Sequence, residues 1–139
     1  MSTYHKINGA ICRLFGKQMN NETKLRIHIT AKSALKFGSE AWVLKKREEQ
    51  RLEETQMKFL RHLLWITKFD KEKNQCIREN TGAQNIVKKI KQYQKKLLQH
   101  VQRLDRNRLP RQALKYRPER RRNIGRPKKR WRDQLHFED

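Results

Sequence analysis

An apolar stripe nineteen residues long is the feature that most constrains the fold of this chain. It consists of Ile86, Ile90, Tyr93, Leu97, Val101 and Leu104, which follow one another at steps of three or four residues. Because an α-helix completes a turn every 3.6 residues, these side chains lie on one helical face. The other faces carry Lys88, Lys89, Lys91, Lys95, Lys96 and Arg103. The segment therefore predicts an amphipathic helix with a basic back.

The other segments also favour helices. A second helical rhythm, that of one buried face, is formed by Leu52, Gln56, Phe59, Leu60, Leu63 and Leu64. Shorter helices are expected near residues 7–15, 71–80 and 112–116, whereas 25–35 has mixed periodicity with a strand-like alternation over 25–29. We predict an all-α fold, a small bundle of four to five helices. Its core between the two long helices would contain Leu52, Phe59, Leu63, Ile90, Leu97 and Val101.

The composition changes after residue 116. Residues 117–139 contain few apolar side chains and include Pro118, Gly125 and Pro127. Such a segment buries too little apolar surface to offset the entropy lost on ordering. We therefore expect a helical domain over 1–116 and an extended, flexible basic arm over 117–139.

The charge balance restricts the choice of partners. The chain has 36 Lys and Arg against 14 Asp and Glu, a net charge of +22 and a pI near 10.7. A charge this large attracts polyanions, so nucleic acid, DNA or RNA, is the expected partner and an anionic membrane surface the weaker alternative. The longest apolar run, residues 63–66, is far shorter than the ~20 residues of a membrane span. The N-terminal residues do not follow the pattern of a signal peptide.

No residue pattern predicts catalysis, a metal or a cofactor. The acids lie mostly in charge-alternating runs such as 45–54, whereas two-metal chemistry on nucleic acid needs carboxylates clustered around ions ~3.5–4 Å apart. Cys12 and Cys76 lack CxxC spacing, and we expect them to be small buried hydrophobic residues of a reducing compartment. The five histidines are scattered. We therefore expect a non-enzymatic chain with no bound cofactor.

The basic segments predict contacts to phosphate. Residues 103–132 contain fourteen Lys or Arg but only two acids, Asp105 and Glu119. Binding that releases counterions weakens steeply as salt rises. The residues expected to contact nucleic acid are Lys88, Lys95, Lys96 and Arg103 on the long helix and Arg120, Arg121, Arg122, Arg126, Lys128, Lys129 and Arg130 on the arm. A solvated charge run is the alternative interpretation.

One short stretch of the arm allows several interpretations. Gly125-Arg126-Pro127 resembles the core of an AT-hook, which lies in the minor groove, but Ile124 stands where such hooks carry an Arg. The clusters at 120–122 and 128–130 also fit a nuclear localisation signal, so a nuclear location is expected, otherwise a cytoplasmic one. Trp131 could stack on an unpaired base, but we favour its docking on the helical domain.

Three blocks occur in an order that resembles a known family. They are "FGSEAWVLKKREEQRLEETQMKFLRHLLWITKFDKEKNQCIRENTG" (37–82), "KKIKQYQKKLLQHVQRLDRNRLPRQAL" (88–114) and "GRPKKRWRDQL" (125–135). Together they resemble the C-terminal region of endonuclease–reverse transcriptases of non-LTR (LINE-type) retrotransposons. Matched positions include Gly38, Ser39, Glu40, Trp42, His100, Val101, Arg103, Gly125, Arg126, Pro127 and Trp131, while Phe37 replaces a Tyr and Gln99 a Gly.

The resemblance implies a thumb-like helical domain and a post-thumb basic region that grip template-primer and target. The catalytic palm and endonuclease domains of that family have no counterpart in the chain, so the resemblance implies a transposon-derived fragment without a catalytic centre. Two alternatives stay open. The chain could be a non-functional retroelement relic, or a protein-interaction module whose apolar stripe pairs with a partner helix. Exposure of Leu97 and Val101 would favour the second alternative.

Overall fold

The computed structural model describes residues 2–14, 19–116 and 130–134, and every regular element in these ranges is helical. The elements are α1 (Ser2–Leu14), α2 (Asn21–Lys36), η1 (Ser39–Ala41), α3 (Lys46–Leu63), η2 (Lys68–Asp70), α4 (Asn74–Thr81), α5 (Ile86–Arg103), α6 (Leu109–Lys115) and η3 (Arg132–Gln134), where η denotes a short 3₁₀ helix. The all-α prediction is confirmed. The described ranges hold six α-helices, one more than the upper expected number.

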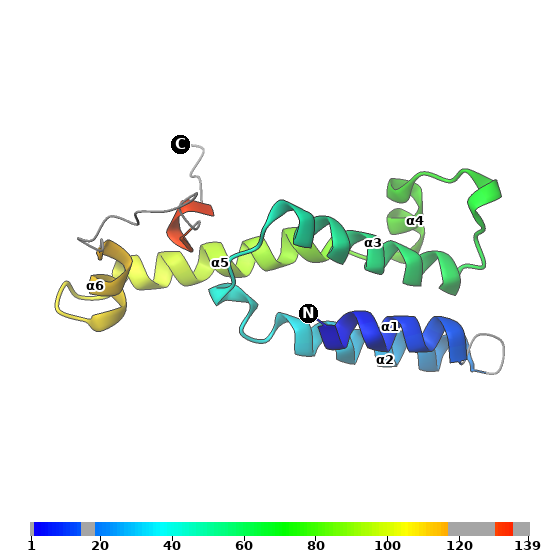
Figure 1. Cartoon of the computed structure of the whole chain (residues 1–139), viewed down its shortest axis with the longest axis horizontal. Coiled ribbons are helices and arrows are strands. Elements are labelled where there is room, and N and C mark those ends of the chain that lie inside the picture. Colours follow the sequence, from blue (N-terminus) through cyan, green and yellow to red (C-terminus); the bar gives the residue numbers. More distant parts are fainter. Residues whose placement is uncertain (1, 15–18, 117–129, 135–139) are drawn as a thin grey trace, which may run out of the picture.

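The helices form an elongated bundle with α5 along its long axis (Figure 1). Helices α1 and α2 form a hairpin, and α3 packs against both of them and against α5. Helix α4 packs on α3 at one end of the molecule, whereas α6 packs on α5 at the other end. The two ends of the molecule therefore carry different surfaces.

Local sequence signals explain where the helices begin and end. Asn20 and Asn85 cap α2 and α5, because their side-chain oxygens accept hydrogen bonds from the backbone N–H groups of Glu22 and Val87. Gly82 ends α4 in the left-handed region at φ 62°, which a glycine adopts without steric cost. Pro110 lies in the first turn of α6, where its missing N–H group costs nothing.

The core consists of two adjoining clusters. The first gathers Tyr4, Ala31, Leu35, Leu44, Leu52, Ile86, Val87 and Ile90, and the second gathers Ile11, Met57, Phe59, Leu60 and Ile77. Both clusters contain side chains of α1 and α3, so α3 is the central packing element. The C-terminal half of α5 extends beyond both clusters toward α6.

Four of the six predicted core residues are buried, and two are not. Leu52, Phe59, Ile90 and Val101 are buried, whereas Leu63 and Leu97 are only half-buried. On α5 the buried positions are instead Gln94 and Leu98. The Gln94 side-chain amide donates a hydrogen bond to the Trp42 carbonyl at 2.9 Å, so a polar residue occupies the packed face. The face of α5 that packs on the domain is therefore centred nearer to Gln94 and Leu98, and Leu97 lies at its edge.

Helix α2 replaces the strand-like pattern noted for residues 25–29. Its buried side chains are Lys24, His28, Ala31 and Leu35, which follow helical spacing. The alternating apolar residues that suggested a strand include Leu25 and Ile29, and both are exposed. The pattern misled because two of the four buried positions of α2 carry polar side chains.

The cysteines differ from the prediction that both are buried. Both are free thiols, but Cys12 is half-buried and Cys76 is exposed on α4. Burial raises the pKa of the Cys12 thiol. Cys76 points to solvent because α4 is short and packs on α3 through Ile77.

Residues 130–134 are docked on the helical domain and are not extended. The Trp131 indole N–H donates a hydrogen bond to the Glu40 carbonyl at 2.6 Å, which confirms the predicted docking of this tryptophan. Gln134 makes two hydrogen bonds to the loop after η1, accepting from the Leu44 N–H at 2.9 Å and donating to the Trp42 carbonyl at 2.7 Å. Residues 117–129 of the predicted arm lie outside the described residues.

Replacing Gln134 by alanine is expected to remove its two hydrogen bonds to the loop after η1. The Leu44 N–H would lose the Gln134 Oε1 acceptor, and a net hydrogen bond contributes about 1 kcal/mol. We therefore expect the Leu44 amide to exchange its hydrogen roughly fivefold faster in the variant, measured by hydrogen–deuterium exchange. Gln112→Ala, on exposed α6, is the control and leaves that amide unchanged. An unchanged Leu44 rate in Gln134→Ala would contradict the docking.

Candidate nucleic-acid interface

The outward face of α5 carries four of the predicted cations. Lys88, Lys95, Lys96 and Arg103 are all exposed, and they recur at steps of 7, 1 and 7 residues. At 100° per residue these positions fall within one band about 100° wide, opposite the buried residues of the helix. The band is about 22 Å long at 1.5 Å per residue. We call these four residues the α5 basic face.

No carboxylate neutralises this face within the described ranges. Helix α5 contains no Asp or Glu. The ion pairs in the described part of the chain are Arg26–Glu22 and Lys91–Glu49, at 2.7 and 3.1 Å. Lys91 projects from the side of α5 that faces α3, which explains its pairing with Glu49. The α5 basic face therefore presents charge to solvent rather than to the fold.

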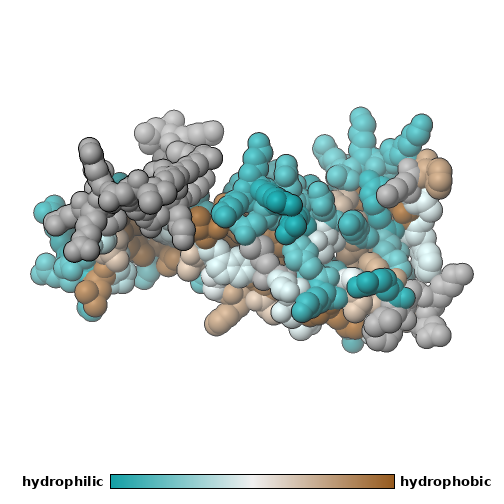
Figure 2. Space-filling view, viewed as in Figure 1, coloured by the Kyte–Doolittle hydropathy of each residue, from teal (hydrophilic) through white to brown (hydrophobic). Residues whose placement is uncertain are grey.

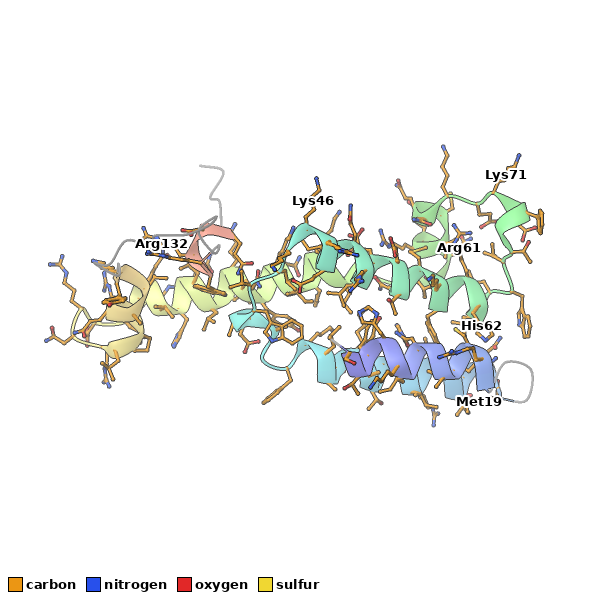
Figure 3. All side chains as sticks on the ribbon, in the orientation of Figure 1. Met19, Lys46, Arg61, His62, Lys71 and Arg132 are labelled. Atoms are coloured by element: carbon orange, nitrogen blue, oxygen red, sulfur yellow. The ribbon has the colours of Figure 1, made fainter. Side chains whose placement is uncertain are left out.

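Arg130 lies apart from the α5 basic face. It lines a pocket of about 540 Å³ together with Leu97, Val101, Tyr116 and Trp131. The two α5 residues of this pocket belong to the apolar stripe of the helix, away from the α5 basic face. Figure 3 shows Arg132, the neighbour of Trp131, beside the C-terminal half of α5, and Figure 2 shows hydrophobic surface in the same region. Arg120, Arg121, Arg122, Arg126, Lys128 and Lys129 lie outside the described residues.

The apolar stripe of α5 is largely used within the chain. Val101 is buried and Leu97 is half-buried, and both border the pocket formed with α6 and Trp131. The exposure that would favour pairing with a partner helix is therefore not observed at Val101. The face of α5 that remains free is the basic one.

The fold brings together a second group of cations that the helical spacing of the sequence does not predict. Arg78 of α4 and the neighbouring Lys88 and Lys89 of α5 line one surface pocket of about 540 Å³. The two lysines were visible as part of the basic back of the helix. The position of Arg78 depends on how α4 packs, which no spacing in the sequence indicates.

The described residues show no group suited to hold a metal. Within residues 2–14, 19–116 and 130–134, no cluster of three or more His, Cys, Asp or Glu could hold an ion. In the same ranges no helix is long and apolar enough to cross a membrane.

Comparisons with known protein families, with curated proteins and with solved structures find no match to this chain.

Proposed function

We propose that the chain binds DNA or RNA through the phosphate backbone, without catalysis. The observation that carries this proposal is the α5 basic face, a row of exposed cations without acids on the same helix. Nucleic acid presents a regular row of phosphates, and cations along a helix can neutralise several of them at once. Three of the four cations of this face are lysines, which act as point charges and do not select one base edge, so we propose binding that tolerates different sequences.

The resemblance to non-LTR reverse transcriptases supports the same proposal from another direction. The three ordered blocks are proposed to derive from the thumb and post-thumb region of such an enzyme, which would make the chain a nucleic-acid grip separated from its catalytic domains. The arm cations at 120–122, 126 and 128–130 are proposed to add phosphate contacts and a nuclear address. In the alternative, a non-functional relic, the charge is inherited and binding would not depend on the α5 basic face.

Replacing Lys95, Lys96 and Arg103 by glutamine tests the proposal. Loss of three phosphate contacts is expected to lower the slope of log affinity against log salt by about 3 and to weaken binding about 100-fold at physiological salt. The measurement is fluorescence anisotropy with a duplex, a single strand and an RNA hairpin over a salt series.

The matched control carries Lys6→Gln, Lys46→Gln and Lys58→Gln, three exposed lysines of α1 and α3. It lowers the net charge by the same amount, and Figure 3 shows Lys46 projecting away from the body of the molecule. Equal affinities and salt slopes for the two triple variants would reject the α5 basic face as the interface. Binding that does not change with salt in the unmodified protein would reject phosphate contact altogether.

A further inference from the structure

The pocket between α4 and the start of α5 is lined entirely by polar side chains. Its lining residues are Gln75, Arg78, Gln84, Asn85, Lys88, Lys89 and Gln92. Three of these are cations and four are amides, and no carboxylate is among them. A site with donors and positive charge but no acid favours an oxyanion.

Arg78 brings an unpaired donor to this pocket. Its side chain is half-buried, and the Nε atom is shielded from solvent without a hydrogen-bond partner. A buried donor left unpaired costs about 1–3 kcal/mol, and more when it belongs to a charged group. Because the Nε atom is shielded, a ligand in the pocket would accept hydrogen bonds from the terminal Nη atoms of this guanidinium.

The start of α4 is held by Arg61 of α3, whose Nη2 atom makes two hydrogen bonds. Arg61 of α3 donates hydrogen bonds to the Glu72 carbonyl and to the Asn74 side chain, both at 2.9 Å (Figure 3). These contacts hold the first residue of α4 against α3. Arg78 is therefore positioned by the fold, although its own guanidinium Nε has no partner.

Two lysine amines lie beside Gln84, in the loop between α4 and α5. Lys89 Nζ donates to the Gln84 side chain at 3.3 Å, and Lys32 Nζ of α2 donates to the Gln84 carbonyl at 3.4 Å. Burial lowers the pKa of Lys32, and the positive charges of Lys36 and Lys89 lower it further. Like charges held this close repel each other, and a bound anion would relieve the repulsion.

Two carboxylates beside the pocket accept hydrogen bonds from amide side chains of its lining. Glu53 accepts a hydrogen bond from the Asn85 side chain at 2.6 Å, and Glu79 accepts one from the Gln75 side chain at 3.0 Å. Both acids therefore orient amides of the lining and do not lie among the residues that line the pocket. The charge that faces the pocket is that of Arg78, Lys88 and Lys89.

We propose that this pocket binds a phosphate group of the nucleic-acid backbone. Arg78 would hold two phosphate oxygens with its planar fork, while Lys88 and Lys89 supply charge. Lys88 belongs also to the α5 basic face, so a strand that follows this face leads directly into the pocket. The volume exceeds that of one phosphate, which leaves room for the adjoining sugar. The inference rests on the proposed function only for the source of the phosphate.

Arg78→Gln separates this site from the α5 basic face. Binding of pyrophosphate, followed by calorimetry, is expected to weaken about tenfold or more in this variant, as for a lost charged contact. Arg106→Gln is the matched control, because Arg106 is exposed near α6 at the opposite end of the molecule. It removes the same charge and keeps wild-type affinity. Lys89→Gln is a second variant, expected to weaken binding like Arg78→Gln.

Oligonucleotide binding identifies the source of the phosphate. Arg78→Gln is expected to lower the salt slope by about one, as for one lost phosphate contact. Pyrophosphate binding should persist in the Lys95, Lys96 and Arg103 triple variant, so failure of the α5 basic face would leave the pocket measurable. Loss of pyrophosphate binding in Arg78→Gln with unchanged oligonucleotide affinity would overturn the backbone assignment in favour of a free phosphate ligand. Equal behaviour of Arg78→Gln and Arg106→Gln in both assays would overturn the pocket itself.

Discussion

Replacing Phe59 by alanine is expected to lower the free energy of unfolding by about 4 kcal/mol. Phe59 is completely buried in α3, within the second core cluster. Its ring stacks on the His28 imidazole, with ring centres 3.9 Å apart and planes 5° from parallel. The alanine variant would leave a cavity and remove this stack, which connects α3 to α2. Urea unfolding followed by circular dichroism measures the change.

Phe69→Ala supplies the control for this prediction. The Phe69 side chain is 92% exposed, so its removal is expected to change the unfolding free energy by less than about 0.5 kcal/mol. Phe59→Leu, which keeps most of the apolar volume, should cost about 1–2 kcal/mol and remains measurable if the alanine variant does not fold. A Phe59→Ala cost below about 1 kcal/mol would show that this part of the core is not packed as described.

Much of the fold follows from spacing that is visible in the chain. The rhythm through Leu52, Phe59 and Leu60 reports a buried face of α3, and all three residues are buried. The apolar steps through Ile86, Ile90 and Val101 report α5 in the same way. These helices could be predicted because their packed faces are mainly apolar and their outward faces are charged.

The remainder of the fold depends on buried polar contacts. On α2 the packed face includes Lys24 and His28, and on α5 it includes Gln94. Hydrophobic periodicity cannot place such residues, because their burial is compensated by specific partners such as Asn8 for His28 and the Trp42 carbonyl for Gln94. Those partners come from other elements of the chain, so they become visible only when the elements are packed.

The two parts of the candidate interface also differ in whether spacing in the sequence predicts them. The α5 basic face could be predicted because Lys88, Lys95 and Arg103 share one helix, and periodicity alone puts them on one side. The pocket between α4 and α5 joins Arg78 to two lysines across a turn and two helices. The missing hydrogen-bond partner of Arg78 Nε can be recognised only once the helices are packed, because a sequence does not show which donors find an acceptor.

Lowering the pH from 7 to 4 is expected to reduce the unfolding free energy through His28. This imidazole is 4% exposed, and its Nδ1 atom lies 3.0 Å from the Asn8 Oδ1 atom. Burial first, and the positive charge of Lys32 second, lower the pKa of His28 to about 4. Tyr4 and Phe59 complete its surroundings with rings that carry no charge at these pH values. The folded chain therefore keeps His28 neutral at pH values where a solvated histidine is protonated.

The sign of the pH effect follows from the two proton affinities. The unfolded state binds a proton at His28 with a pKa near 6.5, and the folded state only near 4. The stabilising contribution is complete above pH 6.5 and is lost as the pH falls toward 4. The loss between pH 7 and pH 4 amounts to about 3 kcal/mol. Burial also lowers the pKa values of His5 and His62, which act in the same direction.

His28→Gln isolates this contribution, because glutamine keeps a hydrogen-bond donor for Asn8 but does not titrate. Urea unfolding at pH 7, 6, 5 and 4 should show the wild type losing about 3 kcal/mol more stability than the variant. Protonation of carboxylates lowers stability in both chains and cancels in the difference. Parallel profiles for the two chains would mean that His28 is protonated in the folded state, and the stack on Phe59 could then not be buried as described.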